Sequence, residues 1–223
     1  MNKEDKESFI NILLVSLVFF LIINMGYGFS FISFLLSIIL FLSLYLPIYF
    51  IKKMSKGEIK FIFVPFIFGK VEIGEIYHSS YYKKFPCWLV CSLFFSSLTL
   101  FKIPILFIGR LIFEGWLNPI KQYDSDEENS ENILISKYLS FFFLFNIGFS
   151  LFLFLINPLL AIVPAIVNFY LIWPIPGNLG FDLYYMNFKE WLKTMPIVLA
   201  SSLVIIMASL LFLGINISSI SSF

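Results

Sequence analysis

Long apolar runs separated by short polar segments dominate this chain, and they predict helices that cross a membrane. The first stretch has no charged residue between Glu7 and Lys52, which leaves room for two spans of about 20 residues each. The segment Met25-Gly26-Tyr27-Gly28 lies between them, and its glycines suit a tight connection. We therefore predict spans over residues 9–25 and 30–51.

The apolar segments that follow are shorter. Residues 59–76 hold a run of β-forming residues interrupted by glycines, which predicts a β-hairpin lying on or in the membrane face. A third span is predicted over residues 86–101, where Lys102 ends it. Residues 103–113 contain Arg110, and a lone cation at mid-bilayer costs about 2.5–3.5 kcal/mol. We expect that piece to be interfacial or re-entrant.

The second half of the chain begins with an acidic segment, residues 124–131, which predicts a solvated loop. No charge then occurs between Lys137 and Asp182. Three further spans are predicted, at residues 136–156, 159–186 and 192–215, and prolines break the second of them. The expected fold is an all-α membrane protein with about six transmembrane helices. Residues 1–223 would form a single integral membrane domain with a short hairpin.

Composition supports a membrane protein and excludes several other classes. Hydrophobic residues make up 60%, charged residues 13%, and the mean hydropathy is +0.93, whereas soluble domains have about 45–50% apolar and about 25% charged residues. A net charge of +1 gives no support for a nucleic-acid partner. Two cysteines cannot form a disulfide-rich scaffold. The chain has a single histidine, which excludes any metal site that needs two histidine ligands from the same chain.

The placement of lysines predicts the orientation in the membrane, because cytoplasmic loops carry an excess of Lys and Arg. Residues 52–84 contain seven lysines, so we expect this loop in the cytoplasm and residues 124–131 on the other side. Six spans then leave both termini in the cytoplasm. The Ile-, Phe- and Lys-rich composition suggests a low-GC genome and a prokaryotic cell membrane.

Few side chains offer catalytic chemistry. His78 stands among tyrosines, and we interpret it as an interface residue. Cys87 and Cys91 share a helix face and are interpreted as packing residues. The unusual segment is 168–187, in which prolines break a membrane helix near its middle. Such a break needs surrounding protein or a polar cavity, so its amides serve either as a polar site or as hydrogen-bonding links between helices.

The broken segment resembles the Asn-Pro-x-Pro-x-x-Asp-Gly helix of the site-two proteases, which are intramembrane zinc metalloproteases. The matching residues are Asn168 followed by Pro174-Ile175-Pro176-Gly177-Asn178-Leu179-Gly180. Ser-Phe-Phe-Phe-Leu-Phe-Asn, ending at Asn146, stands where the family has Ala-Gly-Pro-x-x-Asn. Tyr45-Leu46-Pro47-Ile48-Tyr49 stands where the family has His-Glu-x-x-His. The resemblance implies a site-two-protease-like core and a binding site formed by Asn146, Asn168, Pro174, Pro176, Asn178 and Gly180.

The catalytic positions of that family are replaced in this chain. A catalytic zinc needs three protein ligands, and the resemblance implies two His and one Asp in that role. Those positions are Tyr45, Tyr49 and Leu179 here, and Leu46 replaces the general-base Glu. Because leucine cannot bind a metal, we expect no catalytic residues, no metal and no cofactor.

The sequence therefore favours a catalytically inactive membrane protein, a pseudoprotease in the bilayer that binds or regulates other membrane proteins. A helix or strand of the partner would lie in its groove. One alternative is an intramembrane protease with relocated catalytic residues, such as Asp182 or His78. Another is a transporter or channel component built around the broken helix. Metal analysis separates the first alternative from the favoured function, and a liposome flux assay separates the second.

Overall fold

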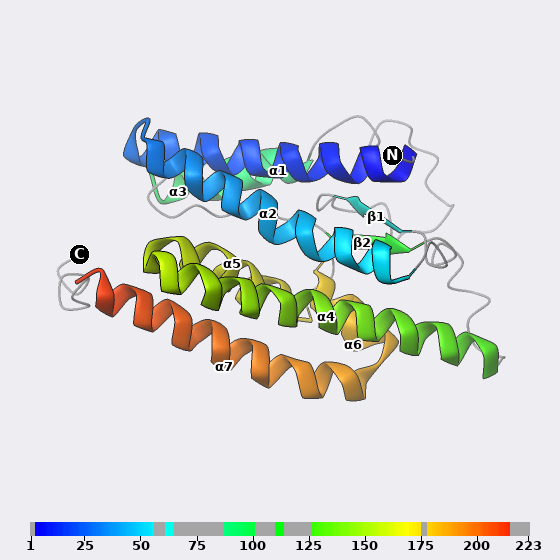
Figure 1. Ribbon diagram of the computed structural model, residues 1–223. Helices are drawn as coiled ribbons and strands as arrows, with labels where there is room; N and C mark the ends of the chain where they lie inside the picture. Colours follow the sequence, from blue (N-terminus) through cyan, green and yellow to red (C-terminus); the bar gives the residue numbers. More distant parts are fainter. Residues whose placement is uncertain are drawn as a thin grey trace. The chain divides into compact units, whose positions relative to one another are not determined.

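The computed structural model describes residues 3–55, 61–64, 87–100, 110–113, 126–174 and 178–214, which form seven helices and two strands (Figure 1). The elements are α1 (Lys3–Tyr27), α2 (Phe31–Met54), β1 (Phe61–Val64), α3 (Cys87–Leu98), β2 (Arg110–Phe113), α4 (Asp126–Ile156), α5 (Pro158–Leu171), α6 (Leu179–Met186) and α7 (Phe188–Phe212).

The chain divides into two compact units, and α2 contributes to both. Unit 1 comprises Met1–Ser37 and Ser55–Ser125, and unit 2 comprises Ile38–Met54 and Asp126–Phe223. Each unit is described by itself below.

Four helices are long and apolar enough to cross a membrane. They cover Asp5–Tyr27, Phe31–Met54, Asn132–Ile156 and Phe188–Phe212. At a rise of about 1.5 Å per residue each exceeds the roughly 30 Å of a bilayer's hydrocarbon core. The protein thus has the architecture of an integral membrane protein.

The described part of the chain does not support the predicted count of six spans, because it contains four span-length helices. Helix α3 has 12 residues and ends at Leu98, so it measures about 18 Å. Leu100, two residues later, adopts a φ of 52°. Within the predicted span over residues 159–186, which prolines were expected to break, the described residues form two helices, α5 with 14 residues and α6 with 8. An apolar run indicates burial in lipid or protein, but it does not show where the backbone leaves the helical conformation.

The described residues do not support the predicted hairpin within residues 59–76. Strand β1 pairs antiparallel with β2, in the register Phe61↔Phe113, so its partner comes from a segment expected to be interfacial. Residues 65–76 lie outside the described part of the chain. β-Propensity identified the strand, but pairing depends on which segment the tertiary structure brings alongside.

Helix α1 holds β1 through the backbone of one residue. The amide N–H of Phe63 donates to Ser8 Oγ at 3.0 Å, and Asn11 Nδ2 donates to the Phe63 carbonyl oxygen at 2.8 Å. The side chains of Phe61, Phe63 and Leu111 are buried. Two hydrogen bonds to α1 and the burial of apolar side chains therefore hold the small sheet of unit 1 in place.

The predicted connection between the first two helices is confirmed. Helix α1 ends at Tyr27, and Gly28 adopts a φ of 78°, in the left-handed region that glycine tolerates. Ser33 Oγ donates to Asn24 Oδ1 at 2.9 Å, and this bond links the two helices just beyond the turn.

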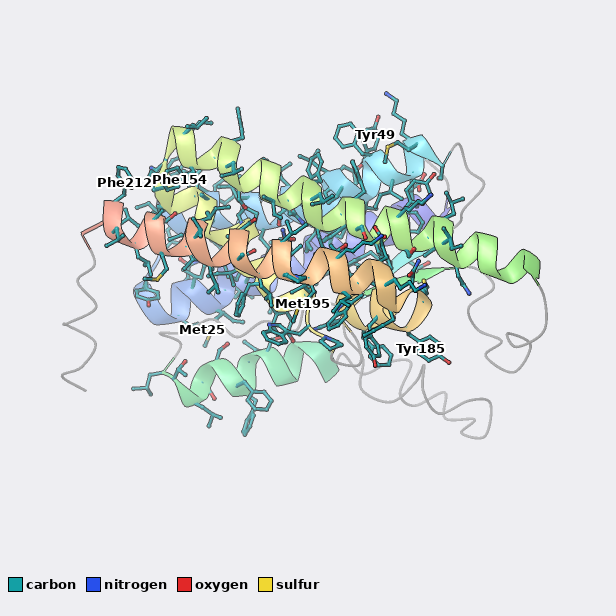
Figure 2. All side chains as sticks on the ribbon, turned by 90° about the horizontal axis from the view of Figure 1, so that it is seen from below. Met25, Tyr49, Phe154, Tyr185, Met195 and Phe212 are labelled. Carbon is teal, nitrogen blue, oxygen red and sulfur yellow. The ribbon has the colours of Figure 1, made fainter. Side chains whose placement is uncertain are left out.

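In unit 2, helices α4, α5 and α7 pack against one another, and α6 packs against α4 and α7 (Figure 1). Helix α5 runs back along α4, and α6 completes the return, so α4 and α7 run in the same direction. Side chains that pack inside this bundle include Leu139, Phe142, Phe143, Ala161, Ala165, Val198 and Ile205. Figure 2 shows Phe154 and Phe212 at one end of the unit and Tyr185 toward the other.

Helices α2 and α4 contact each other in unit 2. Phe50 of α2 contacts Phe145 of α4 with ring centroids 5.5 Å apart. The Met54 end of α2 and the Asp126 end of α4 lie at the same end of unit 2 (Figure 1). The orientation expected from the loop charges stays a prediction.

Large apolar side chains are exposed along all four span-length helices. They include Leu21 on α1, Phe34 on α2, Phe152 on α4 and Val204 on α7. A water-facing monomer rarely exposes such continuous apolar surface. These faces are suited to contact with the lipid bilayer.

Candidate functional site at the broken helix

The break between α5 and α6 has a local cause in the sequence. Trp173 precedes Pro174, and a residue before proline avoids the helical conformation. Pro174 also lacks the N–H that a continuing helix would use. Helix α6 restarts after Asn178, whose backbone is extended (φ −97°, ψ 154°). Residues 175–177, including Pro176, lie outside the described part of the chain.

Two side chains satisfy carbonyl groups that the end of α5 leaves free. The last turn of any helix lacks intrahelical donors for its carbonyls. Asn178 Nδ2 donates to the Tyr170 carbonyl oxygen at 3.0 Å, and Trp191 Nε1 donates to the Ile172 carbonyl oxygen at 3.1 Å. The break is therefore braced from the start of α6 and from α7.

Gly180 lets α6 approach the end of α5. A Cβ atom at this position would overlap the carbonyl group of Ile172 and would lie 2.8 Å from the Ile172 Cα. Because the obstacle is backbone, it cannot turn aside as a flexible side chain would. In this structure the predicted binding residue Gly180 serves close packing of two backbones.

Asn168 and Asn146 lie on the contact between α4 and α5. Asn168 Nδ2 donates to the Phe143 carbonyl oxygen at 2.8 Å, and both asparagines are fully buried. Among the described residues, neither side-chain atom of Asn146 has a hydrogen-bond partner, and the same holds for Asn168 Oδ1. Asn146 is three residues beyond Phe143, so it occupies the same face of α4.

Apolar and aromatic side chains occupy and surround the positions that would hold a zinc ion in a site-two protease. Leu179 is fully buried at the first residue of α6. Tyr45 stacks on Tyr49 with centroids 6.2 Å apart and on Phe41 at 5.3 Å, in a row along α2. Leu46 on the same helix is half-buried. In the described ranges no three His, Cys, Asp or Glu side chains are grouped as a metal site requires, and His78 lies outside them.

Sequence reasoning missed the role of Trp191. Its indole contacts Tyr184 edge-on at 5.2 Å and lies near-parallel to Phe188 at 5.9 Å, while its N–H reaches the broken helix. The sequence offered only a general indication of this role, because the N–H of a buried tryptophan usually donates to some acceptor.

Asp182 was noted in the sequence as a relocated catalytic residue, and the structure places it fully buried on α6. A carboxylate is costly to bury in an apolar interior, and such a residue inside a membrane bundle points to function.

The candidate site thus consists of the facing ends of α5 and α6, with buried amides on α4 and α5 and a buried carboxyl group on α6. Of the predicted binding residues, Asn178 and Gly180 contact the end of α5, and Pro174 follows that end in the chain. Asn168 bonds to α4 about one turn before the end of α5, and Asn146 lies one turn along α4 from that contact. Comparison of the chain with known proteins finds no matching family model, no similar curated protein and no similar solved structure.

Proposed function

We propose that this chain is a multi-pass membrane protein that binds a membrane segment of another protein and does not cleave it. The observation that carries the proposal is Leu179, a fully buried leucine at the position where the site-two protease resemblance calls for a zinc-binding carboxylate. The broken helix of that family is retained and braced, but its ligands are replaced. A scaffold of this kind holds a partner without carrying out hydrolysis.

The break supplies a surface that a partner in the bilayer can contact. Trp173 is 36% exposed, and its ring lies 6.0 Å from that of Phe169. Pro174 beside it is half-buried. Aromatic side chains give large contact areas at protein interfaces, so Trp173 is the point at which we expect a bound segment.

A photoreactive amino acid in place of Trp173, illuminated in native membranes, is expected to give a discrete adduct with another membrane protein. The matched position is Leu203, which is 48% exposed on α7 and lies three turns beyond Trp191 along that helix. Mass spectrometry of the adduct should locate the crosslink in a membrane segment of the partner. Adducts with lipid alone at position 173, or the same adduct from position 203, would contradict the proposal.

Zinc analysis of the same purified protein separates binding from chemistry. We expect no stoichiometric zinc, because Tyr45, Tyr49 and Leu179 occupy the three ligand positions. One tightly held zinc per chain would favour a protease with relocated ligands and would overturn the claim that the protein does not cleave.

We further propose that α5 and α6 together form one broken crossing, which gives five crossings in all. Helices α4 and α7 run in the same direction, and α5 with α6 returns the chain between them (Figure 1). Residues 55–125 begin and end on one side, because the ends of α2 and α4 that they join lie together. The N-terminus then shares that side, and the C-terminus lies opposite.

The charge distribution supports this arrangement. The chain has 15 Lys and Arg, and all of them fall within residues 3–6, 52–137 and 189–193. The segments assigned to the opposite side, residues 28–30, 157 and 213–223, contain none. By the excess of Lys and Arg in cytoplasmic loops, the basic side faces the cytoplasm and the C-terminus lies outside, instead of both termini being cytoplasmic.

Single cysteines introduced into a variant without Cys87 and Cys91 test this topology. An impermeant maleimide is expected to label Met54→Cys and Ser125→Cys from the cytoplasmic side, and Ser222→Cys only from the other side. Met54 is suitable because its side chain is 45% exposed. Labelling of positions 54 and 125 from opposite sides would restore an odd number of crossings between them and refute the five-crossing arrangement.

A further inference from the structure

Two rows of aromatic side chains run along α2 and α4 where these helices contact each other in unit 2. The residues of each row are four positions apart, so they lie one above another on one face of their helix. The α2 row is Phe41, Tyr45 and Tyr49, and the α4 row is Phe141, Phe145 and Phe149. Neighbouring ring centroids within the rows are 5.3 to 6.3 Å apart.

Phe50 joins the two rows into one surface. Its ring centroid lies 5.8 Å from that of Tyr49 and 5.5 Å from that of Phe145. We call the two rows together with Phe50 the aromatic face. Tyr49 is 49% exposed and points outward from α2 (Figure 2), Phe50 is 38% exposed, and the other rings are half-buried. The aromatic face is therefore open to a molecule in the bilayer.

An exposed lysine ends each row. Lys53 comes four residues after Tyr49, and Lys137 comes four residues before Phe141. Because the Met54 end of α2 and the Asp126 end of α4 lie together (Figure 1), both cations lie toward the same end of unit 2 from the contact between the helices. The sequence has no Asp or Glu within four positions of either lysine, so no neighbour along the helix offsets these charges.

The length of the rows matches the depth of one leaflet. Each lysine is twelve positions from the far end of its row, at Phe41 or Phe149, which corresponds to about 18 Å along a helix. Half of the roughly 30 Å hydrocarbon core is about 15 Å. The aromatic face thus extends from the charged surface of a membrane to about its middle.

We infer that the aromatic face binds one anionic phospholipid, with its phosphate group at Lys53 and Lys137 and an acyl chain along the two rows. Lysines at a membrane surface attract anionic lipids. A methylene chain gains many small dispersion contacts along a row of rings, and aromatic side chains lose little conformational entropy on contact. An apolar helix from another protein would leave both charges unmatched. This lipid site goes beyond the proposed function and does not depend on it.

Native mass spectrometry of the full chain in detergent tests the choice of headgroup. Each lysine near an anionic lipid is worth about a fivefold change in binding. We therefore expect the parent protein to bind phosphatidylglycerol about 25-fold more tightly than phosphatidylcholine with the same acyl chains. Lys53→Gln combined with Lys137→Gln should remove this preference. Equal binding of the two lipids by the parent protein would overturn the inference.

The matched control removes two other lysines from the same unit. Lys189 and Lys193 are exposed and four residues apart on α7, but Ile197 and Ser201 follow them at the same spacing in place of aromatic residues. Lys189→Gln combined with Lys193→Gln changes the net charge by the same amount and should leave the preference for phosphatidylglycerol intact. An equal loss in both double variants would show a general charge effect and would also overturn the inference.

A phosphatidylglycerol with a photoreactive diazirine in its acyl chain locates the site in the parent protein. Adducts are expected within residues 41–50 and 141–149, and excess phosphatidylglycerol, but not phosphatidylcholine, should suppress them. An even distribution that includes the exposed Leu203 and Val204 of α7 would contradict a specific site. A photoreactive residue at position 49 that captures a protein in native membranes, instead of lipid, would show that a protein covers the face. Because neither lipid measurement involves Trp173, failure of the lipid site and failure of partner binding are distinguishable.

Discussion

Gly180→Ala is expected to lower the free energy of unfolding by about 3 kcal/mol, although alanine is normally the better helix residue. Gly180 lies in the first turn of α6, where a Cβ atom would overlap the backbone carbonyl of Ile172. Inserting atoms into a packed interior usually costs about 1–3 kcal/mol, and a backbone obstacle places this case at the upper end. Reversible unfolding in detergent micelles, followed by circular dichroism, measures the change.

Gly148 provides the matched control. It lies within α4, and an added Cβ atom there meets nothing within 4 Å. Gly148→Ala should therefore raise the free energy of unfolding by up to about 1 kcal/mol, the ordinary preference for alanine in a helix. The two substitutions are chemically identical and are expected to act in opposite directions. If Gly180→Ala were as stable as the parent protein, α6 would not approach α5 as closely as described.

Trp191→Ala is expected to lower the free energy of unfolding by about 4 kcal/mol, within the range for truncating a buried aromatic residue. The indole is 9% exposed and packs against Tyr184 and Phe188. It also donates to the Ile172 carbonyl oxygen at the break. Its loss therefore removes both packing and a brace, and the same detergent unfolding measures it.

Trp191→Phe separates these two contributions. The ring remains, but the Ile172 carbonyl loses its donor, so a loss of about 1–2 kcal/mol is expected. Trp173→Phe is the control, because that side chain is partly exposed and no described residue accepts a bond from its indole. Full stability of Trp191→Phe would show that the indole contributes by packing alone and does not brace the break.

The pattern of apolar residues was sufficient to identify the four long helices. A charge-free run of about 20 residues satisfies its own backbone as a helix and matches the bilayer, so α1, α2, α4 and α7 follow from composition and length. The turn at Gly28 and the break before Pro174 were also predictable from the sequence. Glycine and proline act on the backbone locally, and their effect does not depend on distant contacts.

Tertiary structure decided the features that depend on distant segments. Strand β1 pairs with β2, which lies beyond α3 in the chain, because strand pairing depends on which segments the fold brings together. The need for glycine at position 180 arises from the backbone of Ile172, which no local pattern reveals. The roles of Trp191 and Asn146 likewise follow from what surrounds them. Sequence by itself determined which segments enter the membrane, because hydrophobic burial is a property of each segment. Only the folded chain determined which strands pair and which polar groups meet, because these are properties of pairs of segments.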